Sequence, residues 1–168
     1  MHEARQPPSW LIFDVSQRKT HMTAIEVIRT QFGDVACGAP CGEADIVRAE
    51  QALGEQLPSE LRSYYLAFDG FRGPTQARFL WPLFARDGLV DFNRFLRQGD
   101  EFPNRFTTSC LFFGDAGVGD MWGLKHDLPG QIIRWSASWG EDFEIAGASM
   151  LEVWLHEKRS YDEIATKG

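Results

Sequence analysis

The sequence predicts a single α+β domain in which a mixed, largely antiparallel sheet is flanked by helices. Helical patterns gather in the first half of the chain and short strand-like segments in the second half, with a helix at the end. Regular alternation of strand and helix, which marks a parallel sheet, is missing. At 168 residues, with 43% hydrophobic and 13% aromatic residues, the chain is long and apolar enough to bury one core.

Apolar residues at helical spacing predict three amphipathic helices, at residues 23–32, 43–53 and 58–68. Gly33 and Gly54 follow the first two helices, where a glycine favours termination. Pro58 suits the start of the third helix, because its missing N–H would be unpaired there anyway. Residues 69–70, Asp-Gly, close that helix, and residues 71–74 are predicted to form a loop.

The second half of the chain predicts a sheet. Residues 79–83 suggest a short strand interrupted by Pro82, and residues 92–96 a short helix before Gly99. Residues 110–113 and 121–124 are typical of adjacent antiparallel strands joined by a glycine-rich turn. Two more strands are predicted at 132–135 and 143–145, followed by a closing helix at 150–155.

The charge and cysteine content narrow the function classes. A net charge of −7 and a pI near 5.1 disfavour a general nucleic-acid binder, which needs clustered Lys and Arg. Acidity also favours capture of a cationic protein, although many soluble proteins are acidic. The apolar run at residues 10–13 is too short for the core of a secretory signal. The sequence also has no stretch of ~18 consecutive apolar residues, which a membrane-spanning helix would require. With an odd number of cysteines, the sequence predicts a cytoplasmic protein.

Motifs for metals, phosphates or catalysis are incomplete. Cys37 and Cys41 have a spacing that suits two metal ligands, but no second pair completes a site. The segment at 114–120, Gly-Asp-Ala-Gly-Val-Gly-Asp, lacks the Lys-Ser/Thr of a phosphate loop and leads into a strand, so a hairpin turn is favoured. His126 stands beside Asp127 without further partners in sequence. The sequence therefore predicts no enzyme, no metal and no cofactor.

The segment at 140–144, Gly-Glu-Asp-Phe-Glu, places three carboxylates near Trp135 and Trp139. This combination suits an aromatic and acidic contact surface for basic side chains, and it equally suits a solvated turn. Tryptophans anchor an interface only where they are exposed, so the two interpretations differ in which of them reach the surface.

Motifs in order along the chain resemble the SMI1/KNR4, or SUKH, family. A helix runs through Leu-Gly at 53–54 into Leu-Pro at 57–58 and ends in Asp-Gly at 69–70, where the family usually has Asn-Gly. Residues 113–120 are similar to the family's Phe-Gly-x-x-Gly-x-Gly-Asp hairpin. The resemblance spans roughly residues 46–155, so we expect an N-terminal extension at 1–20 and a family domain at 21–168. It implies a mixed sheet with flanking helices and, in many bacterial members, non-enzymatic neutralisation of a polymorphic toxin, often a nuclease.

From these features we expect the chain to be an immunity-type protein that binds a basic toxin directly. Two alternatives stay open: a regulatory or scaffold protein, and a small-ligand-binding protein or hydrolase that uses His126 or the loop at 114–120. The oligomeric state is left open. The predicted partner-binding residues are Asp115, Asp120, Trp122, Trp135, Trp139, Glu141, Asp142 and Glu144.

Overall fold

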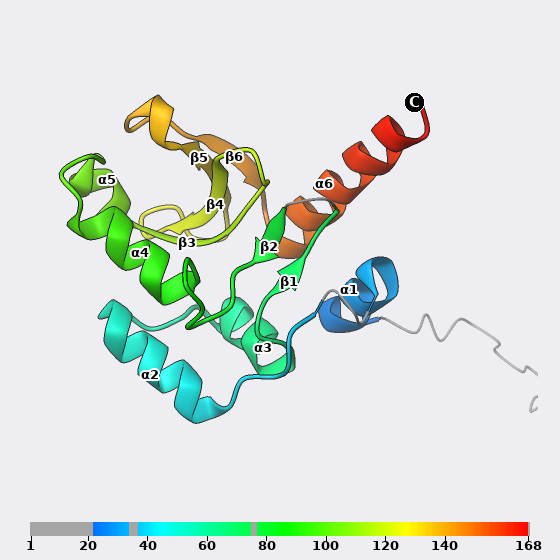
Figure 1. Ribbon diagram of the computed structural model, residues 1–168, viewed down its shortest axis with the longest axis horizontal. Helices are drawn as coiled ribbons and strands as arrows, with labels where there is room; N and C mark the ends of the chain where they lie inside the picture. Colours follow the sequence, from blue (N-terminus) through cyan, green and yellow to red (C-terminus); the bar gives the residue numbers. More distant parts are fainter. Residues whose placement is uncertain (1–21, 34–36, 75–76, 168) are drawn as a thin grey trace, which may run out of the picture.

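A computed structural model describes residues 22–33, 37–74 and 77–167, and these form one α+β arrangement (Figure 1). The predicted N-terminal extension at 1–20 lies outside the described residues. In chain order the elements are α1 (Ala24–Phe32), α2 (Glu43–Leu53), α3 (Ser59–Ala67), β1 (Phe71–Arg72), β2 (Arg78–Leu80), α4 (Leu89–Gln98), α5 (Asn104–Thr108), β3 (Cys110–Asp115), β4 (Asp120–Lys125), β5 (Ile132–Ser136), the 3-10 helix η2 (Ala137–Trp139), β6 (Glu144–Gly147) and α6 (Met150–Ala165).

The strands form one six-stranded sheet in the order β1-β2-β3-β4-β5-β6. Every pairing among the described strands is antiparallel, so the sheet has no parallel component there and is simpler than the mixed sheet predicted. Each strand therefore lies beside its neighbour in sequence, and α4 and α5 are inserted between β2 and β3. This order leaves β1 and β6 at the two edges.

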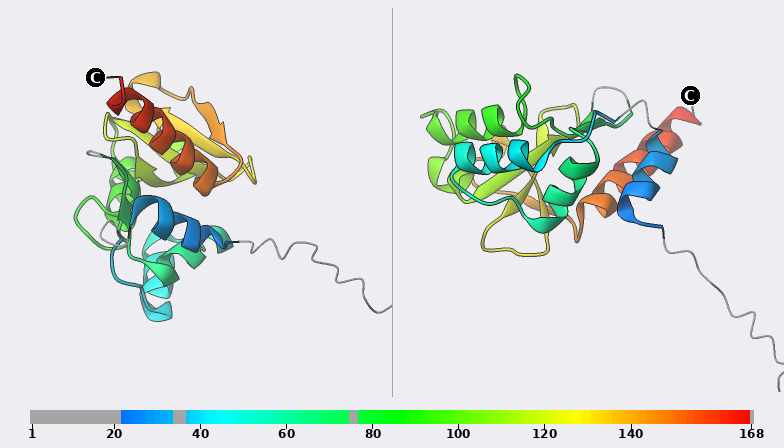
Figure 2. Two further views of the ribbon diagram at one scale, coloured as in Figure 1. Left: turned by 90° about the vertical axis from the view of Figure 1, so that its right-hand side faces the viewer. Right: turned by 90° about the horizontal axis from the view of Figure 1, so that it is seen from below.

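Side chains alternate between two buried clusters along β3. Leu111 and Phe113 point into a large core that α1, α2, α3 and α6 also build, whereas Cys110 and Phe112 point into a smaller core under α4 and α5. This is the period of two expected for a strand covered on both faces. Figures 1 and 2 show the same layers, with α6 across one face of the sheet and α4 and α5 on the other. Both faces of the central strands are thus closed to solvent.

Local sequence signals account for the helix ends. Thr23 and Glu26 form a reciprocal capping box at the start of α1, which satisfies two of the backbone N–H groups that a helix leaves unpaired. Gly54 ends α2 with φ of +75°, a left-handed conformation that favours glycine. The predictions for α1, α2 and α4 are confirmed.

No helix in the described part of the chain combines the length and the apolar character needed to cross a membrane.

Four elements differ from the sequence prediction. Residues 71–72, predicted as loop, form β1, because Phe71 pairs with Leu80 and bridges to Cys37. The strand predicted at 79–83 ends at Leu80, before Pro82. The short helix α5 was not predicted, and α6 continues well beyond the predicted 150–155. The last two turns of α6 have little apolar patterning and are exposed, so periodicity alone does not reveal them.

Candidate protein-binding face

Asp115 is a structural carboxylate. It is 9% exposed and lies at the end of β3, where it accepts three N–H groups. The donors are Trp81 Nε1 at 2.6 Å, Arg78 Nε at 2.8 Å and the Gly117 backbone N–H at 2.9 Å. The prediction that Asp115 contacts a partner is wrong, because its oxygens are already used to join β2, β3 and the following turn.

The glycine-rich segment is the turn of the β3–β4 hairpin, as predicted. Gly117 and Gly119 have φ of +79° and +94°, which residues with a Cβ rarely adopt. A Cβ on Gly114 would lie 2.2 Å from the Phe79 carbonyl oxygen. These glycines are therefore required by the backbone of the hairpin.

Trp122 and Trp135 are both 0% exposed, so the prediction that their rings form part of an exposed contact surface is wrong. Trp122 belongs to the larger core on the α6 side of the sheet, and Trp135 to the smaller core under α4 and α5. Trp135 donates its indole N–H to the Gly140 carbonyl at 2.8 Å, which ties the β5–β6 turn to the core. The position of the turn is thus fixed by a buried side chain.

Asp120 lies at the start of β4 and is neutralised within the protein. Its Oδ2 accepts Arg134 Nε at 2.8 Å, and a second guanidinium N–H of Arg134 reaches the same oxygen. The Asp120 side chain is 17% exposed and the Arg134 side chain 35%, so the pair is partly shielded from water. This charged pair joins β4 to β5 and leaves little negative charge for a partner.

Three of the predicted acidic residues are exposed around the β5–β6 turn. Glu141 and Asp142 follow η2, and Glu144 begins the edge strand β6. Trp139 lies half-buried in η2, and its carbonyl accepts the Asp142 backbone N–H at 3.2 Å. No ion pair involves these three carboxylates among the described residues. The acidic and aromatic surface predicted for this turn is present, with Trp139 as its one half-exposed tryptophan.

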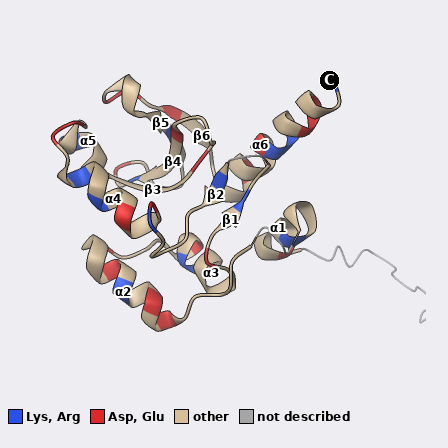
Figure 3. Cartoon of the chain, in the orientation of Figure 1, with Lys and Arg blue, Asp and Glu red and all other residues tan. Residues whose placement is uncertain are grey.

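A second acidic loop, between α4 and α5, lies beside this turn. The Phe102 ring lies 6.4 Å from Trp135, and Phe106 stacks on Phe143 at 5.8 Å. Both loops therefore rest on one aromatic cluster, and Figure 3 shows acidic residues in both loops at the same end of the molecule. We call this surface the acidic–aromatic face; it consists of Phe95, Asp100, Glu101, Phe102, Trp139, Glu141, Asp142 and Glu144.

The sequence reasoning missed the contribution of the α4–α5 loop. Asp100, Glu101 and Phe102 repeat the acidic and aromatic composition of the 140–144 segment, and this repetition was an available signal. Phe95 is 52% exposed and packs edge-on against Phe102 at 5.5 Å. The loop thus adds two carboxylates and the Phe102 ring to the surface, and α4 adds the Phe95 ring.

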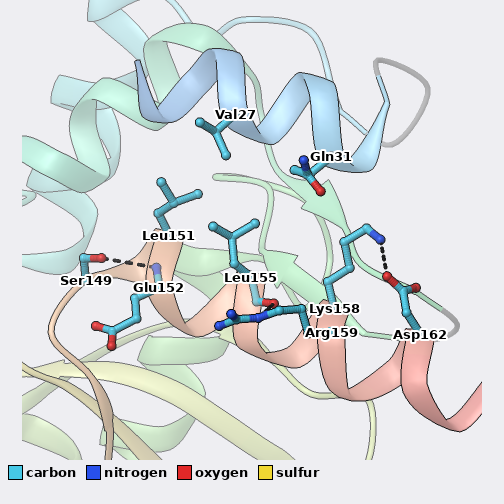
Figure 4. A pocket seen from close by; sticks show the side chains of 9 residues that line it. All are labelled: Val27, Gln31, Ser149, Leu151, Glu152, Leu155, Lys158, Arg159 and Asp162. Atoms are coloured by element: carbon cyan, nitrogen blue, oxygen red, sulfur yellow. Dashed lines mark hydrogen bonds and ion pairs between the residues drawn. The ribbon is translucent and has the colours of Figure 1, made fainter. Parts of the chain in front are cut away.

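A groove of about 540 Å³ separates α1 from α6 at the other end of the molecule (Figure 4). Val27 of α1 and Leu151 and Leu155 of α6 give it apolar walls. Charged residues surround them, including an ion pair between Lys158 and Asp162. The groove contains none of the predicted binding residues.

His126 and Cys110 each have local contacts within the fold. His126 Nε2 lies 2.8 Å from Glu55 Oε2, and the neighbouring Asp127 pairs with Lys125 instead. Burial raises the pKa of the Cys110 thiol to about 11, so the reactive thiolate is disfavoured. Among the residues described, no group of three or more His, Cys, Asp and Glu side chains could hold a metal ion.

Comparison with known families decides the identity of the domain. The sequence model of the SMI1/KNR4 family (SUKH-1) matches residues 40–157, which is more than half of the chain. The chain belongs to the SMI1/KNR4 family. The matched region begins just before α2 and ends within α6, so it includes the whole sheet and the acidic–aromatic face. No curated protein sequence matches the chain closely.

Proposed function

We propose that this SMI1/KNR4 protein is a non-enzymatic immunity protein, which neutralises a basic toxin of the nuclease type by covering it with the acidic–aromatic face. The observation that carries the proposal is the grouping of five exposed carboxylates around one aromatic cluster. Asp100 and Glu101 come from one loop and Glu141, Asp142 and Glu144 from the other, and none has an ion-pair partner among the described residues.

Electrostatics favours a cationic partner for this face. Arg105 of α5 is exposed, and Lys125 Nζ lies 5.9 Å from the centre of the Phe143 ring, but the five carboxylates outnumber these two cations. A surface with a single sign of charge raises the association rate with an oppositely charged partner, and it repels nucleic acid. A nuclease binds a polyanion, so its active-site cleft is basic and matches this surface in charge. Occupation of that cleft would exclude the substrate.

The aromatic part of the face would supply affinity. Phe95, Phe102 and Trp139 are partly exposed, and the rings of Phe95 and Phe102 pack against each other. Rings held in place lose little conformational entropy on binding, and aromatic residues at the centre of an interface contribute most of its energy. The face therefore combines a charged rim with rigid apolar anchors.

Membership of the SMI1/KNR4 family supports a binding function, because the family is generally non-catalytic. Localisation in the cytoplasm is part of the proposal, since an odd number of cysteines suits a reducing compartment. A regulatory or scaffold role would use the same kind of contact with a partner that is not a toxin.

The test begins with affinity capture by the tagged full chain from lysate of its host, at low and moderate salt, followed by identification of the bound proteins. Purified partner then binds two variants of equal net charge, Glu141→Lys in the face and Glu163→Lys near the end of α6. We expect Glu141→Lys to weaken binding roughly tenfold at low salt, and less at high salt, where charges are screened.

The control variant should bind like the wild type, because α6 ends at the opposite side of the molecule (Figure 1). Equal affinities for the two variants would show that the partner does not use the acidic–aromatic face. A partner that is not a toxin would shift the assignment to the regulatory role.

A further inference from the structure

A small cavity opens between the β6 edge of the sheet and α6. It has a volume of about 180 Å³. Since a water molecule fills about 30 Å³ of liquid, this space suits one side chain rather than a whole peptide or a large ligand. Its walls come from β4, β5 and β6 and from one side of α6: Trp122, Arg134, Glu144, Ile145, Ala146, Val153, His156 and Glu157.

The charges on the walls are unbalanced. Arg134 is the one Lys or Arg side chain in the lining, and Asp120 already neutralises it through two guanidinium N–H groups. Glu144 and Glu157 form no ion pair with any residue that the structure describes. The cavity thus lies between two carboxylates whose charge the protein leaves uncompensated, and it selects for a cation.

Trp122 forms part of the wall on the sheet side. Its side chain is fully buried, and its indole N–H has no acceptor among the described residues. A buried donor without an acceptor is unfavourable, so an occupant that brings an oxygen atom would be favoured there.

We propose that this cavity receives one lysine or arginine residue of the basic partner. The cationic group meets Glu144 and Glu157, and a main-chain carbonyl of the same residue accepts the Trp122 N–H. The inference rests on the proposed function, and it extends the acidic–aromatic face through Glu144 to Glu157 of α6. Glu157 becomes a specificity residue.

The test uses a defined probe and does not need the natural partner. N-acetyl-lysine N-methylamide is titrated into the full chain, and the Trp122 indole N–H and the backbone amides of β6 and α6 are followed by NMR. N-acetyl-norleucine N-methylamide, which has the same stem without the charge, is the matched control. We expect saturable shifts at Trp122 and residues 144–157 with the lysine probe, and much weaker shifts with the norleucine probe.

Substitution separates this cavity from general attraction to an acidic protein. Glu144→Gln and Glu157→Gln should each weaken lysine-probe binding roughly fivefold, whereas Glu163→Gln, at an exposed position near the end of α6, should leave it unchanged. These changes preserve side-chain size, so the fold is retained. Shifts spread over the surface, equal binding of both probes, or unchanged binding by both glutamine variants would overturn the proposal.

The two proposals fail in different ways. If the lysine probe does not bind but Glu141→Lys still weakens the natural partner, the cavity inference is wrong and the proposed function stands. If the probe binds in the cavity but the natural partner binds the Glu141→Lys variant as tightly as the wild type, the acidic–aromatic face is not the toxin-binding surface. The cavity is then a separate cation site.

Discussion

Replacement of Asp115 by alanine should lower the free energy of unfolding strongly. It should leave the residues of the acidic–aromatic face unchanged. The change removes the acceptor for the N–H of Trp81, which is fully buried and cannot turn to water. An orphaned buried donor costs about 1–3 kcal/mol. Loss of the ion pair with Arg78 and of the hydrogen bond from the Gly117 N–H adds to this cost. The Arg78 contribution is reduced because its side chain is 30% exposed and can be hydrated. We expect a total loss of about 3–5 kcal/mol in the free energy of unfolding.

Urea unfolding followed by tryptophan fluorescence measures this loss, and thermal unfolding should show a Tm lower by roughly 6–20 °C. Asp142→Ala is the matched control, because that carboxylate is exposed and its loss should change the free energy of unfolding by less than about 0.5 kcal/mol. If Asp115→Ala stays within about 1 kcal/mol of the wild type, the structural role assigned to this carboxylate is refuted.

Two further predictions concern buried groups. Asn93 donates to the carbonyls of Leu89 and Phe112 and accepts the Phe112 N–H, so Asn93→Leu should cost about 2–4 kcal/mol in urea unfolding; a nearly neutral result would show that water replaces these bonds. Burial raises the pKa of the Cys110 thiol to about 11. Burial and the negative charge of Asp69 raise the pKa of the Cys41 thiol to about 12. In the folded protein both thiols therefore keep a proton that they release above pH 9.0 in the unfolded chain. The free energy of unfolding should therefore fall as pH rises from 9.0 toward about 12, and Cys41→Ala should make this fall shallower than in the wild type; an unchanged slope would contradict the assignment.

Most of the fold was predictable because its elements carry local signals. The boundaries of α2 follow from an apolar stripe and a terminal glycine, and the β3–β4 hairpin follows from two apolar runs around a glycine-rich turn. β1 was not predictable, because a two-residue strand depends on its partner Leu80 rather than on its own sequence. Short helices such as α5 are also hard to predict from sequence, since tertiary packing stabilises them more than intrinsic propensity does.

The site was predictable only in part. Glu141, Asp142 and Glu144 are exposed in a turn, which their composition suggested. Trp122 and Trp135 belong to the core because alternate residues of a strand face opposite sides, and here both sides of the sheet are covered. The sequence does not reveal the second covered face, since it depends on the insertion of α4 and α5 between β2 and β3. The proximity of residues 100–102 to residues 139–144 has the same origin.

Hydrogen exchange of the chain with and without its captured partner tests the central claim most directly. If the acidic–aromatic face binds the partner, protection should concentrate at residues 95–103 and 137–144, and exchange at residues 24–32 of α1 should not change. Protection at residues 24–32 with none at the acidic–aromatic face would contradict the account and would assign partner binding to the groove between α1 and α6.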